Sequence, residues 1–341
     1  MNKKLPTISI IIPAFNEEKN ISVLFKSLKN QKYPRSKIEY IVIDDSSTDN
    51  TALVSKAFGA KVYKVTTHDI ELNKGIGLAK SKNSYVYFLD ADMEVFDNYF
   101  FRKLINPFLE NKNIIGSFTR EFSLEVKSKK VINSLLRFIS YDPLQRDPLY
   151  EFISTSLEKT FVKKKSNYFL CKFIPTQIPP VGRILYKKSN LLSTEVKNNK
   201  QFIDMESVEI MTRKYSGYFA YVPEAKIRHY HTDTLAKMIK KRLRNLEKDY
   251  LPNLEHKYFL WFNPKSKKDV YKIFFWIIYA NLFVPELIRG IFKSIYYKDL
   301  AFMWHPIVSI ATTDAIIYGF LKTPKGRKLA IELVRRLIFK Q

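Results

Sequence analysis

The sequence of 341 residues contains only one cysteine, Cys171. A single cysteine cannot form an intrachain disulfide, and it cannot provide a zinc site that needs several thiolates. Cysteine usage therefore gives no indication of an oxidising compartment. A secretory signal peptide is not expected either. The apolar run near the N-terminus is cut by Pro13 and leads to Glu17 and Glu18 instead of a small-residue cleavage site.

Two common nucleotide-binding signatures are also missing. A dinucleotide-binding Rossmann domain carries Gly-x-Gly-x-x-Gly after its first strand. The corresponding turn here is PAFNEE, which contains no glycine. The Gly-x-Gly at Gly75 and Gly77 is not followed by Lys-Ser or Lys-Thr, so it is not a P-loop. The sequence thus argues against a nicotinamide-dependent dehydrogenase and against a P-loop enzyme.

Apolar and basic residues are abundant. Hydrophobic residues make up 46% of the chain, which supports a sizeable core in one large α/β domain with an appendage, or in two domains. The formal net charge of +25 predicts attraction to nucleic acid, anionic lipid or phosphorylated substrates. Tyr and Trp beside Lys and Arg favour a membrane interface as much as RNA. No nucleic-acid-binding module is recognisable, so we expect no nucleic acid partner.

Strands and helices are expected to alternate in the first part of the chain. Apolar runs predict four strands, at Ile8–Ile12, Tyr40–Ile43, Lys61–Val65 and Tyr85–Leu89. Helices are predicted around Ile21–Leu28, at Asp49–Phe58 and from Asn73 to Lys82. Asn16 is expected to cap the first of these helices. Such alternation predicts an α/β fold with an open, mostly parallel sheet.

Polar residues follow three of these strands. They are Asn16 and Glu17 after Pro13, Asp44 with Asp45, and Asp90 with Asp92. Ligands of open parallel sheets bind beyond the carboxyl ends of the strands, where these residues should meet. Two carboxylates at a strand exit suit Mg²⁺ or Mn²⁺, especially when a diphosphate supplies further oxygens. A solvated turn is the alternative for an isolated Asp-x-Asp, but the convergence of three strand ends favours a site.

Four segments in order, SIIIPAFNEE, YIVIDDSSTDNT, KGIGLAK and YFLDAD, resemble the family 2 glycosyltransferases. The resemblance covers about residues 5–120. It implies a GT-A-type mostly parallel open sheet flanked by helices, with a nucleotide-diphospho-sugar as donor. It also implies that an acidic residue deprotonates the acceptor hydroxyl, which attacks the anomeric carbon with inversion.

The resemblance also implies roles for individual residues. The nucleoside pocket would be lined by Pro13, Ala14, Glu17, Asp44 and Asp45. Lys74 would approach the donor phosphates. The donor-contacting Asp-x-Asp would be Asp90, Ala91 and Asp92, with Asp90 and Asp92 as ligands of Mg²⁺ or Mn²⁺ and Asp92 as the more direct one. Alternatively, Glu17 serves only the helix dipole and Lys74 is a solvated charge.

The catalytic base is expected near a later helix start. Family members carry Glu-Asp there, followed by an Arg and a Gly, and the Asp is the base. Counting back from Arg213 places Ser207 on that position, whereas counting back from Gly217 places Glu206 there. Ser207 has no useful basicity. We therefore expect Glu206 to be the base, with Asp204 as the second candidate.

Two further groups of residues are candidates by resemblance. His229 and His231, spaced by two, would share one face of a strand. The family often has a histidine here near the metal or the diphosphate, so His229 is expected to join the metal ligands. Arg242 and Arg244, on a basic helix that starts near Leu235, would grip the departing diphosphate. A solvated basic face is the alternative for these arginines.

The last third of the chain is expected to form a hydrophobic and amphipathic helical appendage. Ile273–Val284 is strongly apolar but shorter than a membrane span. Leu300–Leu321 is long enough, yet it contains Asp314. These segments could form a helical hairpin or lie in the membrane interface. The amphipathic stretch Lys328–Phe339 again suggests an anionic membrane surface, and a buried appendage is the alternative.

We therefore expect a GT-A glycosyltransferase domain at residues 1–250 and a membrane-associated helical region at 251–341. Within the first, residues 5–120 would bind the nucleotide-sugar and 121–250 the acceptor. The predicted reaction is metal-dependent, inverting transfer to a lipid-linked or cell-surface glycan at the cytoplasmic face of the cell membrane. Alternatives are a soluble family 2 glycosyltransferase with a different acceptor and a catalytically inactive nucleotide-sugar-binding relative.

Overall fold

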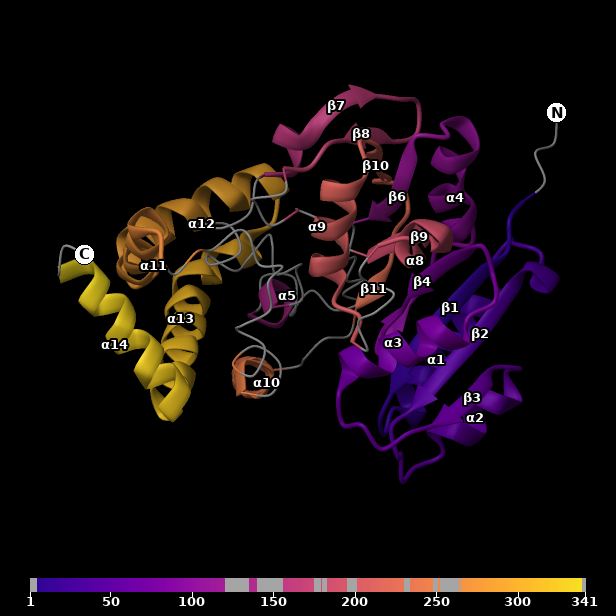
Figure 1. Cartoon of the computed structure of the whole chain (residues 1–341), viewed down its shortest axis with the longest axis horizontal. Coiled ribbons are helices and arrows are strands. Elements are labelled where there is room, and N and C mark those ends of the chain that lie inside the picture. Colours follow the sequence, from indigo (N-terminus) through magenta and orange to yellow (C-terminus); the bar gives the residue numbers. More distant parts are fainter. Residues whose placement is uncertain are drawn as a thin grey trace. The chain divides into compact units, whose positions relative to one another are not determined.

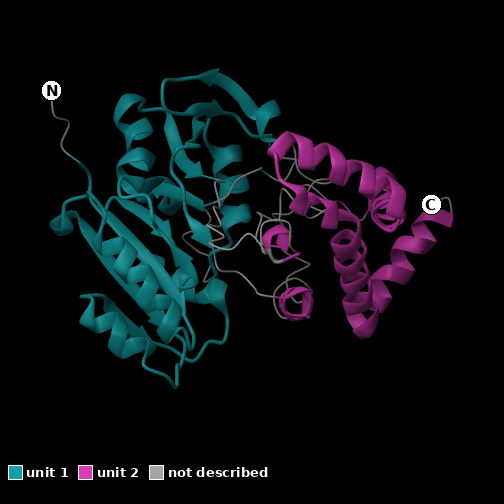
Figure 2. Cartoon of the chain, turned by 180° about the vertical axis from the view of Figure 1, so that it is seen from behind, with its two compact units in different colours: residues 1–123, 156–175, 179–230 teal, residues 124–155, 176–178, 231–341 magenta. Residues whose placement is uncertain are grey.

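The computed structural model describes residues 5–119, 135–139, 156–174, 179, 183–194, 201–229, 234–247, 251, 263 and 265–338. The chain divides into two compact units (Figure 2). Unit 1 consists of Met1–Ser123, Ser156–Pro175 and Pro179–Tyr230, and unit 2 of Leu124–Thr155, Thr176–Ile178 and His231–Gln341. The boundary predicted between residues 250 and 251 falls inside unit 2. The functional division of the chain into these parts stays a prediction.

Unit 1 is built on a sheet that has nine strands among the described residues, in the order β3-β2-β1-β4-β9-β6-β10-β8-β7 (Figure 1). The strands are β1 (Ile8–Ala14), β2 (Ile38–Asp44), β3 (Lys61–Lys64), β4 (Tyr85–Phe88), β6 (Ile114–Thr119), β7 (Phe161–Lys164), β8 (Phe169–Cys171), β9 (Arg183–Lys187) and β10 (Tyr218–Tyr221). β1, β2, β3 and β4 pair in parallel, and β9 joins β4 to β6 in antiparallel pairing. The predicted α/β class with a mostly parallel open sheet is confirmed.

Helices cover this sheet. They are α1 (Glu18–Lys29), η1 (Arg35–Lys37), α2 (Thr51–Ala57), α3 (Ile70–Lys80), α4 (Phe100–Glu110), η3 (Leu157–Thr160), α8 (Lys188–Leu192) and α9 (Asp204–Lys214). α1 buries Ile21, Leu24, Phe25 and Leu28, the stripe that the sequence predicts. α3 packs on β1 so closely that a Cβ on Gly77 would lie 2.2 Å from Ile11 Cγ2. Glycine therefore lets α3 approach the strand.

The predicted cap of α1 is wrong. The N-cap of α1 is Glu17, and Asn16 lies one residue before it with a φ of 55°. The Asn16 side chain is used elsewhere, because its Oδ1 accepts the Thr48 N–H at 2.8 Å. The Asn16 side chain thus connects the loops after β1 and β2 instead of capping α1.

Unit 2 is helical in its described residues. Its elements are α5 (Leu135–Ile139), α10 (Leu235–Asn245), α11 (Lys267–Ala280), α12 (Phe283–Tyr297), η6 (Leu300–Trp304), α13 (His305–Lys322) and α14 (Pro324–Ile338). A small core forms around Phe138, Met238, Phe302 and Val308. α11 and α12 are bent by 82° at a short break. Among the described residues, one helix, Leu300–Lys322, is long and apolar enough to cross a membrane.

Candidate active site

The carboxyl ends of β1, β2 and β4 lie at the same edge of the sheet. β1 runs parallel to β2, with Ala14 opposite Asp44, and parallel to β4, with Ile11 opposite Phe88. Parallel strands end on the same side, so the residues that follow them are brought together. Pro13 and Ala14, which we expect to line a nucleoside pocket, are the last two residues of β1 and are buried. The prediction that the polar strand ends share one edge is confirmed.

The loops after β1 and β2 are joined by hydrogen bonds. Backbone N–H groups donate from Asn16 to Ser47 Oγ, from Glu17 to Thr51 Oγ1, from Glu18 to Asp49 Oδ2 and from Thr48 to Asn16 Oδ1, over 2.8 to 3.0 Å. Glu17, at the N-cap of α1, also accepts a hydrogen bond from Asn20 Nδ2 at 2.7 Å. These contacts hold the two loops in one arrangement around the end of β2.

Asp44 has a carboxylate oxygen available for a ligand. Its side chain is fully buried, and its Oδ1 accepts the Ser47 N–H at 3.3 Å. Its Oδ2 is buried too and has no hydrogen-bond partner in the part of the chain that the structure describes. A buried acceptor of this kind is costly unless a donor satisfies it. An N–H group of a ligand at this edge would be such a donor.

Asp45, in contrast, organises the protein. Its carboxylate accepts the Thr67 N–H at 2.9 Å and the Asn73 side-chain amide at 3.0 Å, which orders the segment before α3. Burial opposes the charge of Asp45, but the N–H of His68 and the side chains of Asn73 and Thr67 outweigh it and lower its pKa. Asp45 therefore remains ionised and contributes to the edge through the loop that it holds.

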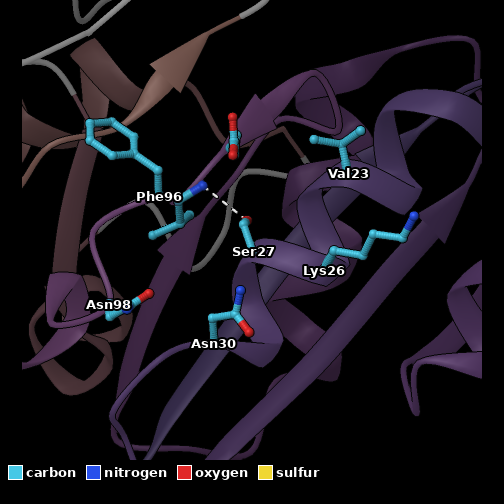
Figure 3. A pocket seen from close by; sticks show the side chains of 8 residues that line it. Val23, Lys26, Ser27, Asn30, Phe96 and Asn98 are labelled. Atoms are coloured by element: carbon cyan, nitrogen blue, oxygen red, sulfur yellow. Dashed lines mark hydrogen bonds between the residues drawn. The ribbon is translucent and has the colours of Figure 1, made fainter. Parts of the chain in front are cut away.

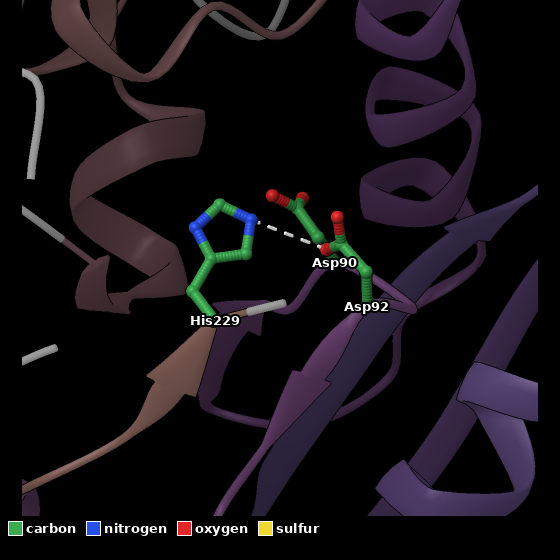
Figure 4. Close-up of side chains that lie close together, drawn as sticks. All are labelled: Asp90, Asp92 and His229. Carbon is green, nitrogen blue, oxygen red and sulfur yellow. Dashed lines mark ion pairs between the residues drawn. The ribbon is translucent and has the colours of Figure 1, made fainter. Parts of the chain in front are cut away.

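Asp90, Asp92 and His229 form a candidate metal centre. Both aspartates follow β4, and the next residues form β5 (Met93–Glu94), which pairs antiparallel with β11 (Arg228–His229). Figure 4 shows the three side chains pointing toward one another, and one ligand atom from each lies within 4.8 Å of the others. His229 Nε2 lies 3.3 Å from Asp92 Oδ1. Two carboxylates and an imidazole fit Mn²⁺ better than Mg²⁺, which prefers an all-oxygen shell.

Contacts of Arg228 and Glu94 also hold the short sheet formed by β5 and β11. Arg228 Nη1 lies 3.0 Å from Glu94 Oε2, and the Arg228 guanidinium lies 4.3 Å from the centre of the Phe96 ring. Because Arg228 and His229 are neighbours on β11, this anchor also fixes the backbone that carries the histidine.

A cleft of about 280 Å³ lies beside this anchor (Figure 3). Its lining residues are Val23, Lys26, Ser27, Asn30, Glu94, Val95, Phe96 and Asn98. Ser27 Oγ accepts the Val95 N–H at 3.0 Å there, which ties α1 to the chain after β5. None of the predicted site residues lines this cleft.

Lys74 is buried between two carboxylates. Its Nζ lies 3.0 Å from Asp204 Oδ2 and 3.1 Å from Glu71 Oε2. Burial alone would lower the pKa of Lys74, but Asp204, Glu71 and Asp90 outweigh this effect and raise it. Lys74 is therefore a fixed cation at the sheet edge, and the alternative of a solvated lysine is wrong because only 5% of the residue is exposed.

Glu71 belongs to this group, although its position in the sequence does not mark it. Asp69 caps α3 by accepting the N–H groups of Glu71 and Leu72, so α3 starts before the predicted Asn73. Glu71 thus lies one turn before Lys74. Burial raises the pKa of Glu71 to about 7, with a further contribution from Asp204 and an opposing one from Lys74.

Arg183 is the second cation of the site and was not expected from the sequence. It is the first residue of β9 and forms an ion pair with Asp90. Burial alone would lower its pKa, but Asp90, Asp204 and other neighbours keep it high, so the side chain stays charged. β9 pairs antiparallel with β4, which brings Arg183 next to the end of β4. This pairing joins segments that are far apart in the sequence, and no local sequence pattern around Arg183 predicts it.

The two candidate bases lie in the first turn of α9. Asp204, its first residue, contacts Lys74. Glu206 is buried two residues later, and Ser207 donates to the Ile203 carbonyl within the helix. The contact with Lys74 therefore connects Asp204 to the site, and the role of each carboxylate stays a prediction.

The remaining candidates are distributed as follows. Ala91 is buried between the two aspartates. Arg242 and Arg244 lie on α10 in unit 2, and their contact with a diphosphate stays a prediction. His231 lies outside the described residues.

Comparisons with known proteins agree with this geometry. Residues 9–170 match the family model described as Glycosyl transferase family 2. The 4,4'-diaponeurosporenoate glycosyltransferase of Staphylococcus haemolyticus is 37% identical over 110 residues, which are 30% of this chain and 28% of that protein. The poly(ribitol-phosphate) beta-N-acetylglucosaminyltransferase TarS of Staphylococcus aureus is 32% identical over 91 residues, which are 25% and 16% of the two chains. The chain thus spans less than a third of the length of either relative.

A solved structure extends the comparison to the fold. The mannosyltransferase PcManGT of Pyrobaculum calidifontis, in complex with GDP-Man and Mn²⁺, aligns over 93% of this chain and 88% of its own with a TM-score of 0.51. The sequence identity is 14%, so this likeness concerns the fold. With the four sequence segments and the sheet order, these comparisons show that residues 9–170 match glycosyl transferase family 2 and that the chain has a GT-A-type fold.

Proposed function

We propose that the protein transfers a sugar from a nucleotide-diphospho-sugar, with inversion, to a lipid-linked or cell-surface glycan. The observation that carries the proposal is the gathering of Asp90, Asp92 and His229 at the edge where Lys74 and Arg183 also lie. Carboxylates for a cation and fixed positive charges are what a departing diphosphate requires. The solved mannosyltransferase with GDP-Man and Mn²⁺ supports the donor class and the metal.

The nucleoside would bind at the ends of β1 and β2. Asp44 Oδ2 is the buried acceptor there, and uracil and guanine both carry a ring N–H that can donate to it. Adenine has no such ring donor on its base-pairing edge. Pro13 and Ala14 would supply the wall beside the base, and Glu17 the rim. We therefore expect uridine or guanosine donors.

The metal would be held by Asp90, Asp92 and His229, and Asp92 and His229 are already in contact. When bound, Mg²⁺ or Mn²⁺ supplies positive charge that stabilises the leaving diphosphate. Lys74 and Arg183 would add to this charge from the protein. In the structure Asp204 neutralises Lys74, and Asp90 neutralises Arg183. Diphosphate binding would therefore replace these carboxylate partners with phosphate oxygens.

That exchange would free a base. Asp204 released from Lys74 would be a carboxylate in the first turn of α9 that could take the proton of an acceptor hydroxyl. Glu206, the first candidate from the sequence, is the alternative on the same turn. The link to Lys74 favours Asp204, because binding of the donor would then prepare the base. Burial raises the pKa of Glu71, so this carboxyl would compete less strongly than Asp204 with the donor for Lys74.

The acceptor and the location are proposed from charge and from the relatives. Two relatives are named for 4,4'-diaponeurosporenoate and for poly(ribitol-phosphate). The net charge of +25 favours attraction to an anionic surface, which supports our proposal of a lipid-linked or cell-surface glycan acceptor at the cytoplasmic face of the cell membrane.

A thermal-shift experiment tests the donor site. UDP-sugars and GDP-sugars should raise the unfolding temperature more with Mn²⁺ than without it, because the metal links the diphosphate to the protein. Asp92→Ala should lose the Mn²⁺-dependent part of the shift, while Glu158→Ala, which removes an exposed carboxylate of unit 1, should keep it. Equal shifts in both variants would count against the metal role.

Turnover tests the reaction. Release of the nucleoside diphosphate in the presence of membrane extracts, with the anomeric configuration of the product read by NMR, should reveal transfer with inversion. Donor binding without any release of diphosphate would favour the catalytically inactive relative instead.

A further inference from the structure

Helix α12 of unit 2 has its apolar side turned outward. The exposed apolar residues of its main stripe are Val284, Ile288, Ile291, Phe292, Ile295 and Tyr296. They recur at the spacing of one helical face. The buried residues of the same helix are Glu286, Gly290 and Ser294, which form the opposite face. A helix in a water-soluble domain has the reverse arrangement, with its apolar stripe inside.

The inner face of α12 is held by charged groups. Glu286 Oε2 lies 2.7 Å from His305 Nδ1, and both side chains are fully buried. Lys293 Nζ lies 3.2 Å from His305 Nε2, and Arg289 lies 3.7 Å from Glu286 Oε1. Gly290 packs against the Phe302 carbonyl, where a Cβ would approach to 2.6 Å. The charged groups of α12 are therefore in contact with one another or with His305 inside unit 2, and the outward stripe contains no charge.

The apolar surface continues around the bend onto α11. Tyr271, Phe275 and Ile278 are exposed on α11 at the spacing of one helical face. Leu282 and Phe283 are exposed between them and the α12 stripe, where the two helices meet at 82°. We call α11, α12 and their junction the elbow. An exposed apolar surface of this extent marks an interaction site.

Charge around the elbow indicates an anionic bilayer as the occupant. No charged residue occurs between Ile273 and Pro285, which includes the junction. Lysines lie at the far ends of the two helices instead, as Lys267, Lys268 and Lys272 on α11 and Lys298 after α12. The apolar junction of the two helices would lie among the acyl chains, and their basic far ends would contact the anionic headgroups. α14 adds five basic residues, Lys325, Arg327, Lys328, Arg335 and Arg336, against one acidic residue, Glu332.

The dimensions favour insertion into one leaflet. α12 has 15 residues and α11 has 14, so each is about 22 Å long or less, against about 30 Å of hydrocarbon in a bilayer. Leu300–Lys322 is long enough to cross, but half of its apolar window is buried inside the protein. Asp314, near its middle, is exposed. An ionised carboxylate at that depth of a bilayer would be costly.

We propose that the elbow inserts into one leaflet of an anionic bilayer and that none of the described helices crosses it. This inference deepens the proposed function, on which it rests for its purpose, because it would keep the enzyme at the surface where a lipid-linked acceptor resides. The membrane contact itself is read from α11 and α12 alone.

Vesicle binding tests the elbow. The full chain is floated with vesicles of phosphatidylcholine alone or with phosphatidylglycerol added, in the absence of donor. Phe292 and Leu53 are equally exposed, at 68%, and Leu53 lies on α2 of unit 1. Phe292→Glu should weaken binding to the anionic vesicles about tenfold or more, since it removes a buried aromatic ring from the leaflet. Leu53→Glu should bind like the unmodified protein.

Several results would overturn the proposal. Equal binding of both variants, or equal binding to vesicles without phosphatidylglycerol, would do so. Loss of self-association in Phe292→Glu, seen by light scattering, with unchanged vesicle binding would assign the elbow to a contact between copies of the chain. Circular dichroism of Phe292→Glu must match that of the unmodified protein, and the exposed position makes this the expected result.

A labelling experiment tests the one-leaflet topology. Single cysteines replace Lys298 or Lys325, on either side of α13, in a Cys171→Ser background, and sealed membrane vesicles are treated with an impermeant maleimide. Both positions should react to the same extent. Reaction at only one of them would mean that α13 crosses the bilayer.

The proposed function and the elbow can fail separately. Loss of vesicle binding with an intact donor-induced thermal shift would refute the elbow alone. Intact vesicle binding without any sugar transfer would refute the proposed function alone.

Discussion

Lys74 Nζ lies 3.0 Å from Asp204 Oδ2, although the two residues are 130 positions apart in the chain. The pair joins α3, which follows β3, to α9, which carries both candidate bases. In the function that we propose, this contact would connect donor binding with proton transfer. We draw four predictions from this contact and from the similar ion pair between Arg183 and Asp90.

Replacement of Lys74 should weaken donor binding. Lys74→Met removes a buried cation and leaves Asp204 and Glu71 facing each other without it. Loss of a charge-assisted hydrogen bond of about 1.5–3 kcal/mol corresponds to a fall in nucleoside-diphosphate affinity of about 10- to 100-fold. Calorimetric titration measures this, with Lys56→Met, at an exposed lysine of α2, as the control that should retain full affinity.

Two variants distinguish which carboxylate is the catalytic base. If Asp204 takes the proton, Asp204→Asn should lower kcat by about 10²- to 10⁴-fold, because general base catalysis contributes that much. Donor affinity should change far less, since the neutral amide can still accept from Lys74. Glu206→Gln is the matched change on the same turn of α9. A larger loss of kcat in Glu206→Gln would return the role to Glu206.

Arg183 should compete with the metal. Its guanidinium neutralises Asp90 in the structure, so Arg183→Gln should increase the affinity for Mn²⁺ in the absence of donor. The same change should weaken nucleoside-diphosphate binding, because one cation of the site is lost. Electron paramagnetic resonance of free Mn²⁺ reports the first effect without turnover. Weaker Mn²⁺ binding in Arg183→Gln would contradict the competition.

Glu71 should make stability depend on pH. Its pKa is raised from 4.5 to about 7 by burial, so the folded state holds a proton that the unfolded state has released between these values. The stabilising contribution of neutral Glu71 is complete below pH 4.5 and is lost as the pH rises through 7. Glu71→Gln should remove this decline. Urea titrations across the range measure it, and parallel curves for both proteins would contradict the pKa shift.

Local sequence patterns predicted the carboxylates at the strand ends of the candidate site. Asp44 is the last residue of β2, and Asp90 and Asp92 come shortly after β4. Parallel pairing of both strands with β1 then brings these residues to one edge. The predicted positions of β1, β2 and β4 differ from the observed ones only at their ends. Residues tied to a strand end were thus predictable from sequence.

Arg183 and Glu71 were not predictable in this way. Arg183 reaches Asp90 only because β9 pairs antiparallel with β4, and nothing within the chain segment around Arg183 encodes that partner. Glu71 was missed because α3 starts earlier than the pattern indicates, after a cap at Asp69. Its raised pKa depends on burial, which is a property of the assembled site.

The elbow was anticipated only in part. Ile273–Val284 reads as one apolar segment, but α11 ends at Ala280 and α12 begins at Phe283. Pro285, in the first turn of α12, lacks an N–H and is tolerated there but not inside a continuous helix. The outward direction of the apolar stripe depends on the buried Glu286 and His305, whose contact joins two separate helices.

His229 of the candidate metal centre lies on β11, a strand of two residues. Arg228 and His229 of this strand pair with Glu94 and Met93 of β5. Nearly all of unit 1 must be in place before that short pairing can form, because the intervening chain contributes β6 to β10 of the main sheet. Closing so long a loop is entropically costly. If Asp90, Asp92 and His229 hold a cation, as we propose, its binding would therefore stabilise the fully assembled unit 1 over any partly folded form.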